Sequence, residues 1–374
     1  MRKIGKIHIL LLFASLVFTL VCMELGLRLI ERLNYYPGFF KAINSAYTPF
    51  DVKTGEGLYY AHPYTAYDMK PGYGIPGEVT INSYGFRGKE FDIAKAPGTF
   101  RIVALGGSTT YGIGLEEDGT YPYHLEKVLQ ERLGTDKVEV INAGLVSATT
   151  AESLSRFLLK VVPLDPDMVI FYEGYNDLPP RMFNDYSGDY YHFRKIPDYK
   201  PPFLSRFLLY RIAVSGFKAS LHYPNTTLLS HTWKFENLPE EESERIENFN
   251  NTSTDTYKRN LSYIIDVARA RDITIVLSTF GIDDDAPDWN DHMPEELWAK
   301  GIGENNAAVT ELAEEYDLPL IEYYEYGLRN KDVFLDSIHM TSEGNEKMAN
   351  FFAGTLVPII RDQLAAGNQQ DGER

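Results

Sequence analysis

The sequence predicts an α/β fold in which helices cover both faces of a five-stranded parallel sheet. Short apolar, β-branched runs bounded by Gly, Pro or Asp are typical of strands that are buried on both faces. Segments with helical spacing separate these runs, and such alternation favours parallel strands joined by crossover helices. The expected strands are residues 101–105 (RIVAL), 138–141 (VEVI), 168–172 (MVIFY), 273–278 (ITIVLS) and 318–322 (LPLIE), and the expected helices are residues 121–133, 150–161, 256–271, 297–316 and 342–364.

An apolar run at residues 7–23 precedes these elements and follows Arg2, Lys3 and Lys6. Its length and composition predict a segment that inserts into a membrane, and the basic cluster predicts a cytoplasmic N-terminus. No small-residue cleavage site follows the run, which favours a retained signal anchor over a removed signal peptide. A buried helix of a soluble domain would fit the length but not the basic cluster. We therefore expect a single-pass membrane protein whose main domain lies outside the cytoplasm.

The expected domain organisation has four parts. Residues 1–33 form the cytoplasmic end and the anchor, residues 34–98 form a juxtamembrane wrapping segment rich in Gly, Pro and Tyr, and residues 99–366 form the sheet domain. A polar tail covers residues 367–374. The sheet domain carries a long insertion at residues 178–255, which separates the third strand from the next helix.

One stretch of the insertion, residues 203–221, has apolar residues near helical spacing together with Arg206, Arg211 and Lys218, and it has no acidic residue. This pattern predicts an amphipathic helix. We expect it to pack on the sheet domain. A lid or a helix that faces the membrane is the alternative.

Composition excludes several classes of protein. The chain of 374 residues has 36 basic and 53 acidic side chains and a net charge of −17. Such a chain lacks the basic surface that nucleic acid requires, so we expect no nucleic-acid partner. The one cysteine, Cys22, excludes an internal disulfide and any zinc site built from several cysteines.

Residues suited to acyl transfer follow the expected strands. Ser108 follows the first strand after two glycines, Gly144 follows the second strand, and Asn176 follows the third. Asp336 and His339 follow the fifth strand and are three residues apart, so that one turn of chain can place the carboxylate beside the imidazole. Because the carboxyl ends of parallel strands meet at one edge of the sheet, we expect these groups to lie close together.

These residue types predict a serine hydrolase. Ser108 is the expected nucleophile, His339 the general base, and Asp336 the group that orients the imidazole and stabilises its cation. The backbone N–H groups of Ser108 and Gly144 and the amide of Asn176 are the expected oxyanion hole. The order Ser, Asp, His resembles that of α/β-hydrolases, but the sequence contains no G-x-S-x-G.

The four blocks resemble those of the SGNH, or GDSL-type, hydrolases: a serine turn, a glycine, G-x-N-D and D-x-x-H, in this order between Gly106 and His339. The resemblance implies a flavodoxin-like three-layer α/β/α sandwich and ester hydrolysis that needs no metal or cofactor. Residues 82–87 (NSYGFR) also resemble a stretch found ahead of the serine block in membrane-anchored bacterial members. The chain departs from the family at Gly107, where the family name places Asp, and this puts the local turn and its hydrogen bonds in question.

The function expected from these observations is that of a membrane-anchored esterase that removes acetyl or similar small acyl groups from surface glycans. The alternatives are a lipid acylhydrolase, and an O-acyltransferase or non-hydrolytic binding module of a glycan-assembly complex. The insertion bears on this choice, because its aromatic residues could line an acyl channel or stack on sugars. These residues are Phe183, Tyr186, Tyr190, Tyr191 and Phe193.

Other polar residues compete less well for a catalytic role. We expect Asp177 to cap a helix or brace a loop, and the acidic run at residues 283–285 to be a solvated loop, because it lacks the spacing and glycine of a calcium loop. No other histidine has a partner at the spacing of metal ligands. These histidines are His8, His62, His124, His192, His222, His231 and His292.

Overall fold

The computed structural model describes residues 6–36, 39–40, 43, 58–75, 79–195, 203–213, 232–283, 285–286, 290, 292–327 and 331–372. The chain divides into two compact units, one of residues Met1–Ala61 and Pro197–His231, the other of residues His62–Ile196 and Thr232–Arg374. The boundaries expected near residues 34 and 99 fall inside these units. Parts of the expected wrapping segment, insertion and tail lie outside the described residues, as do Arg2, Lys3, Lys218, His222 and His231.

The larger unit contains a five-stranded sheet with the strand order β6-β5-β7-β8-β9, in which every neighbouring pair is parallel. The prediction of a five-stranded parallel sheet is confirmed. The last strand is shorter than the sequence suggested and pairs over two residues. The strands are β5 (Phe100–Gly106), β6 (Val138–Asn142), β7 (Met168–Tyr172), β8 (Thr274–Ser278) and β9 (Leu320–Ile321).

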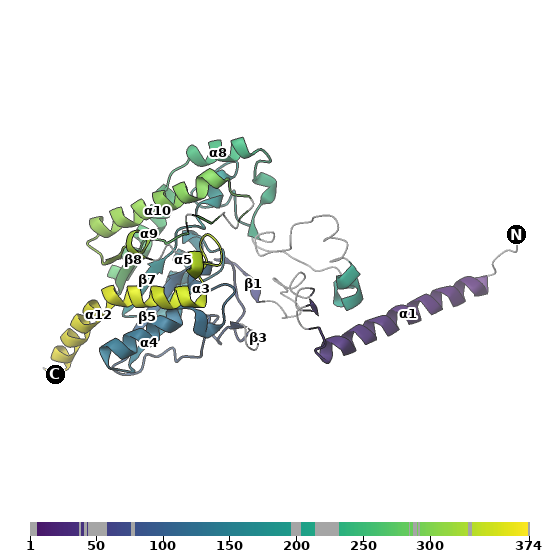
Figure 1. Cartoon of the computed structure of the whole chain (residues 1–374), viewed down its shortest axis with the longest axis horizontal. Coiled ribbons are helices and arrows are strands. Elements are labelled where there is room, and N and C mark those ends of the chain that lie inside the picture. Colours follow the sequence, from purple (N-terminus) through teal and green to yellow (C-terminus); the bar gives the residue numbers. More distant parts are fainter. Residues whose placement is uncertain are drawn as a thin grey trace. The chain divides into compact units, whose positions relative to one another are not determined.

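Two layers of helices cover the sheet, as Figure 1 shows. The helices α4 (Tyr121–Leu133) and α12 (Ser342–Gly372) pack against each other on one face. On the other face lie α5 (Thr150–Arg156), which continues into the π-helical segment η2 (Phe157–Val161), and the helices α9 (Asp255–Arg269) and α10 (Glu295–Glu315). The helix expected at residues 342–364 is longer than predicted and extends into the expected tail, to residue 372.

Side chains that alternate along the strands fill the two cores. Val103 and Phe171 point to the face of α9, where they join Ile264 in one buried cluster. Tyr172, the next residue of β7, points to the opposite face and packs edge-on against Tyr121 and Phe352, with ring centroids 6.0 Å and 5.8 Å away. This period of two is that of a strand buried on both sides, and it explains why the runs are apolar throughout.

Local signals set the ends of the crossover helices. The helix α4 has Pro122 in its first turn and ends at Gly134, whose φ of 68° is favourable for glycine. The helix α5 begins with a capping box, in which Thr149 and Glu152 satisfy each other's backbone N–H groups. These signals agree with the helical ranges expected from the sequence.

The direction in which strands are added to the sheet reverses between β5 and β7. The chain runs from β5 to β6 on one side and then crosses to β7 on the other side of β5. In open α/β sheets, ligands bind at such a reversal, beyond the carboxyl ends of the strands. The loops that follow β5 and β7 carry Ser108 and Asn176 and are therefore at the reversal.

The chain also contains several short elements. They are β1 (Tyr59–His62), β2 (Ala66–Met69), β3 (Gly74–Ile75), β4 (Val79–Thr80), α3 (Ser108–Tyr111), η1 (Glu117–Gly119), η3 (Val162–Leu164), η4 (Pro179–Met182), η6 (Phe235–Asn237), α8 (Glu242–Asn250), α11 (Tyr323–Tyr326) and η7 (Lys331–Val333).

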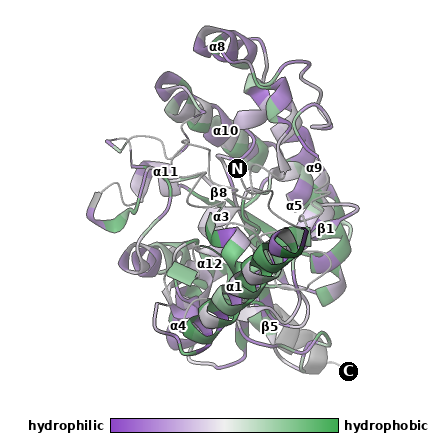
Figure 2. Ribbon diagram, turned by 90° about the vertical axis from the view of Figure 1, so that its right-hand side faces the viewer, coloured by the Kyte–Doolittle hydropathy of each residue, from purple (hydrophilic) through white to green (hydrophobic). Residues whose placement is uncertain are grey.

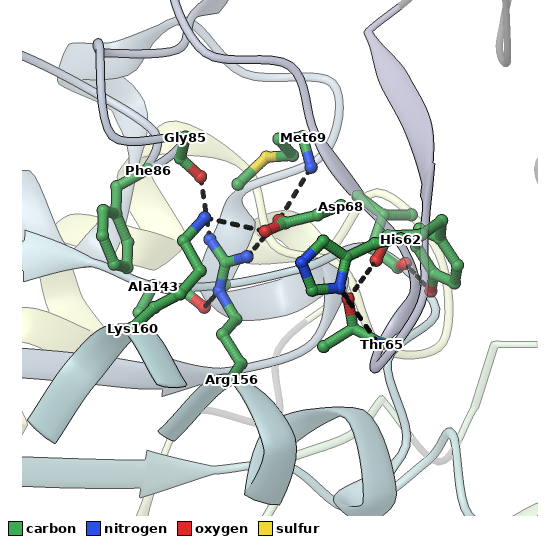
Figure 3. A network of polar contacts seen from close by, with 12 residues as sticks. His62, Thr65, Asp68, Met69, Gly85, Phe86, Ala143, Arg156 and Lys160 are labelled. Atoms are coloured by element: carbon green, nitrogen blue, oxygen red, sulfur yellow. Dashed lines mark hydrogen bonds and ion pairs between the residues drawn. The ribbon is translucent and has the colours of Figure 1, made fainter. Parts of the chain in front are cut away.

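A buried ion network ties the segment before the sheet to the sheet domain (Figure 3). Asp68 of β2 is fully buried between the Arg156 guanidinium and the Lys160 ammonium, and Lys160 Nζ lies 2.7 Å from Asp68 Oδ2. Arg156 also donates to the carbonyls of Gly85, at 2.9 Å, and Ala143, at 3.2 Å. Although burial opposes ionisation, the two cations hold the pKa of Asp68 below its ordinary value. Figure 3 shows these groups converging from separate segments, so the network holds the chain at Asp68 and Gly85 against the sheet domain.

The NSYGFR segment braces the turn that follows Ser108. Asn82 Oδ1 accepts hydrogen bonds from the N–H groups of Tyr84 and Phe86, both at 3.0 Å, and closes the segment on itself. The buried Arg87 then donates to the carbonyl of Gly112 at 2.9 Å. Gly112 ends α3, the short helix that begins with Ser108. The segment thus stabilises the end of the short helix that begins with Ser108.

The aromatic residues of the insertion pack into a cluster of their own. Phe183 and Phe193 are buried and their rings contact Trp233, with centroids 6.0 Å and 4.9 Å away. Tyr190 is also buried, and Tyr191 is 75% exposed. In the described part of the insertion, the buried rings are therefore occupied by packing on one another and on Trp233.

The smaller unit contains α1 (Lys6–Arg32), whose length and composition fit a membrane anchor or a signal sequence. Figure 2 shows apolar residues along this helix. Residues 203–213, which begin with η5 (Phe203–Arg206), group with α1 and not with the sheet domain. The carboxylate of Glu24 accepts the N–H groups of Leu208 and Leu209 at 3.0 Å and 2.9 Å. The packing of this stretch on the sheet domain stays a prediction, and residues 214–221 lie outside the described residues.

Candidate active site

Ser108 stands at the first position of α3, directly beyond the carboxyl end of β5. Its Oγ lies 2.7 Å from Nε2 of His339, a residue 231 positions later in the chain. Both side chains are buried. The fold therefore brings a hydroxyl and an imidazole into direct hydrogen-bond contact at the edge of the sheet where the sequence placed them.

Asp336 holds the other side of the imidazole. Its Oδ2 lies 2.8 Å from His339 Nδ1, and its Oδ1 accepts the backbone N–H groups of Ile338 and His339 at 2.9 Å and 2.7 Å. Burial alone would raise the pKa of Asp336, but the hydrogen bonds from His339 and Ile338 outweigh it and lower the pKa. The carboxylate is thus ionised, and it favours the tautomer of His339 that carries its proton on Nδ1 and accepts at Nε2.

Gly107 lets the chain turn between β5 and α3 against two polar side chains. A Cβ on this residue would overlap Oε2 of Glu173 and lie 2.6 Å from Nδ2 of Asn176. The family aspartate would therefore not fit here without moving these groups. Because Gly107 has no side chain, it does not cap the first backbone N–H groups of α3. These groups can donate hydrogen bonds to a ligand.

Asn176 follows β7, and its carboxamide lies beside the Ser108 turn, as the contact with Gly107 shows. Nδ2 of Asn176 donates to Oε1 of Glu173 at 3.3 Å. An amide nitrogen has two hydrogens, so the second N–H of Asn176 is left to donate elsewhere. The structure thus brings Asn176 to the place where the sequence predicted it.

Gly144 also approaches the serine turn, but its N–H already has an acceptor. A Cβ on Gly144 would overlap the backbone of Tyr111, so only glycine fits against α3 here. The Gly144 N–H donates to Oδ1 of Asn142 at 3.0 Å. To serve as an oxyanion donor, this N–H would have to turn away from Asn142 or be shared with it.

The competing polar residues have structural contacts. Asp177 accepts the N–H of Thr150, at 2.8 Å, and the hydroxyl of Tyr190, at 2.7 Å, so it caps α5 and braces the insertion. Nε2 of His192 lies 2.8 Å from the carbonyl of Pro180. Within the described residues, no group of three or more His, Cys, Asp or Glu side chains is placed to hold a metal ion. Asp284, Asp288 and Asp291 of the acidic loop lie outside the described residues.

Glu173 is a polar residue of this site that the sequence analysis did not single out. It is 2% exposed and directly follows β7. Burial, with Asp177 nearby, raises the pKa of Glu173 to about 8. A charged residue type next to an otherwise apolar strand was the only signal in the sequence, and nothing local indicated that the side chain would be buried.

The chain belongs to the GDSL-like Lipase/Acylhydrolase family, whose pattern matches residues 104–347, more than half of the chain. It is therefore a serine ester hydrolase of this family, which confirms the resemblance seen in the four sequence blocks. Among curated proteins, no sequence matches the chain.

Solved structures of similar chains include three esterases and lipases. The lipase/acylhydrolase from Enterococcus faecalis is 18% identical, with 71% of this chain and 97% of that chain covered and a TM-score of 0.41. An acetyl xylan esterase is 17% identical over 68% of this chain and 98% of that chain, with a TM-score of 0.42. A mutant of an acetyl-xylooligosaccharide esterase from Geobacillus is 13% identical over 70% and 95%, with a TM-score of 0.42.

Proposed function

We propose that the chain hydrolyses acyl esters through Ser108, His339 and Asp336. The observation that carries the proposal is the continuous contact from Ser108 Oγ to His339 Nε2, at 2.7 Å, and from His339 Nδ1 to Asp336 Oδ2, at 2.8 Å. As Ser108 Oγ attacks the ester carbonyl, His339 takes the hydroxyl proton and then gives it to the leaving alcohol. Water repeats the sequence on the acyl-enzyme, with His339 again as base, and releases the acid and free Ser108.

The oxyanion of the tetrahedral intermediate would lie between α3 and the loop after β7. The backbone N–H of Ser108 and the second N–H of the Asn176 amide are the donors that the geometry supports best. Gly107 makes no side-chain hydrogen bond at the start of α3, and Glu173 accepts only one of the two N–H groups of the Asn176 amide. Gly144 would be a third donor once its N–H leaves Asn142. Such donors act on charge that develops in the transition state, so they raise kcat more than they tighten substrate binding.

Replacing Asn176 with Ala tests this oxyanion hole. We expect kcat to fall by about 100- to 1,000-fold, the usual cost of one lost donor, with KM changed little. Steady-state kinetics on a soluble aryl ester measure both constants. A rise in KM at unchanged kcat would instead make Asn176 a substrate-binding residue and would contradict its role as an oxyanion donor.

The apolar helix α1 supports a membrane-anchored enzyme with its sheet domain outside the cytoplasm. Expressed in a bacterium, the full chain should stay in the membrane pellet after carbonate washing. Protease added outside the cytoplasmic membrane should degrade the sheet domain. Release of a soluble protein that lacks α1 would contradict the anchor and indicate a cleaved signal sequence.

We propose small acyl groups, acetyl first among them, on surface glycans as the substrate class. Two observations support this: the aromatic residues of the insertion are packed on one another, and without Arg2, Lys3 and Lys6 the 36 basic and 53 acidic side chains give a net charge of −20. A domain of this charge is poorly suited to approach anionic lipid.

A series of esters of rising acyl length tests the substrate class. We expect kcat/KM to be highest from acetyl to butyryl and to fall for chains of about ten carbons or more, because the buried rings in the described part of the insertion pack on one another and are not left to bury added methylenes. Long esters that are better by about tenfold, or roughly 1.4 kcal/mol of barrier, would favour a lipid acylhydrolase. Transfer of the acyl group to a sugar in place of water would favour an O-acyltransferase.

A further inference from the structure

Glu173 lies beside the proposed oxyanion hole with one of its carboxyl oxygens unused. Its Oε1 accepts the N–H of Gly174 at 3.2 Å and Nδ2 of Asn176 at 3.3 Å. Its Oε2 is buried and has no hydrogen-bond partner among the described residues. A buried carboxyl oxygen without a partner costs free energy, so its position calls for an explanation beyond stability.

The position of Oε2 depends on the glycine at residue 107. A Cβ at this position would overlap Oε2, and the backbone φ of −91° at Gly107 is one that other residues adopt. The glycine is therefore required by the space that the side chains of Glu173 and Asn176 take and not by backbone strain. Gly107 and Glu173 thus form a complementary pair: the serine block has no side chain at this place, and the carboxyl of Glu173, directly after β7, lies there.

We propose that Glu173 is a positioning residue that holds the Asn176 carboxamide by one N–H, in the space left by Gly107, so that the other N–H points into the oxyanion hole. The proposal rests on the roles proposed above for Ser108 and Asn176. An amide without such an acceptor could turn its oxygen toward the hole and repel the oxyanion. The Oε1 contact selects the orientation in which nitrogen faces the hole.

The charge of Glu173 then controls the reaction. Burial and Asp177 raise the pKa of Glu173 to about 8, so the carboxyl is mostly protonated at neutral pH. Burial raises the pKa of Asp177 itself to about 6, so Asp177 is mostly ionised before Glu173 loses its proton. Four buried tyrosines interact electrostatically with Glu173: Tyr67 on β2, Tyr121 on α4, Tyr172 on β7 and Tyr257 on α9. Burial raises the pKa of each of these tyrosines, so their hydroxyl groups stay neutral as Glu173 titrates.

An ionised Glu173 would place a negative charge next to the developing oxyanion and oppose it. We expect kcat/KM of the full-length enzyme to fall by about tenfold or more as the pH rises through 8 toward 9.5. In Glu173→Gln, which keeps the acceptor and cannot ionise, activity at pH 7 should stay within a few-fold of the wild type and the alkaline decline should vanish. The matched control is Glu126→Gln, a buried glutamate of α4 that accepts the N–H of Val140 at 3.0 Å, and it should keep the wild-type profile.

A second set of variants separates positioning from general stability. Glu173→Ala should lower kcat with little change in KM, and adding Asn176→Ala should cost little more, because the two residues act as one unit. Gly107→Asp should lose activity because its side chain meets both Glu173 and Asn176, and Gly107→Asp with Glu173→Ala should regain part of it because one of the two overlaps is removed. An alkaline decline that persists in Glu173→Gln, or additive losses in the double variant, would overturn the proposal. Activity retained in Ser108→Ala would contradict the proposed function itself, whereas the outcomes above contradict only the role of Glu173.

Discussion

Ser108→Ala and His339→Ala are each expected to reduce kcat by about 10⁴- to 10⁶-fold, the largest effect that any single change in this chain should have. The reason is that Ser108 Oγ and His339 Nε2, 2.7 Å apart, act as one nucleophile. Combining the two changes should therefore add little. Hydrolysis of an aryl acetate by the purified full-length protein measures the loss, with thermal melting to show that each variant is folded.

Ser153→Ala is the matched control for this result. Ser153 is also a buried serine, and its hydroxyl has no hydrogen-bond partner among the described residues. Its replacement should leave both activity and stability unchanged. Activity of folded Ser108→Ala within about tenfold of the wild type would contradict the role of Ser108, because no other group is expected to replace a lost nucleophile at this level.

Asp68→Ala is expected to lower the free energy of unfolding by about 3–5 kcal/mol, because it leaves the buried cation Arg156 without its anion. For a domain of this size, such a loss would lower Tm by roughly 10 °C. Since the folded-state pKa of Asp68 is below its ordinary value, the stabilisation is complete above about pH 4. It is lost as the pH falls through the folded-state pKa.

The comparison for Asp68 is an exposed ion pair, Lys258 with Glu311 at 2.6 Å. Lys258→Ala should change the free energy of unfolding by about 1 kcal/mol or less, because solvent screens the pair. Melting of each full-length variant in detergent, followed by circular dichroism, gives both values. If Asp68→Ala had the same Tm as Lys258→Ala, the ion network of Figure 3 would not stabilise the fold as stated.

The sheet was predictable because its signals are local. An apolar run such as residues 168–172 can be buried on both faces only in a covered sheet, and β7 has the same bounds. The helix α4 likewise begins and ends where Pro122 and Gly134 predict. The contact of Ser108 with His339 followed from topology, because the carboxyl ends of parallel strands meet at one edge.

Other features depend on contacts between distant segments that no local pattern encodes. The helical spacing of residues 203–213 indicated an apolar face but not its partner, and the partner contact is made by the carboxylate of Glu24 with two backbone N–H groups. The burial of Glu173 depends on the missing side chain of Gly107, which lies in a distant part of the sequence, between β5 and α3. The departure at Gly107 is visible in the sequence, but no local pattern there indicates that Glu173 lies in the space.

Labelling with a fluorophosphonate probe tests most directly whether Ser108 is the activated nucleophile. The probe phosphonylates a serine hydroxyl only where a base activates it, and it requires no knowledge of the natural substrate. Intact mass and peptide mapping of the full-length protein should find one adduct, on Ser108, which is absent in Ser108→Ala and strongly slowed in His339→Ala. An unlabelled wild-type protein, or an adduct on another residue, would contradict the account.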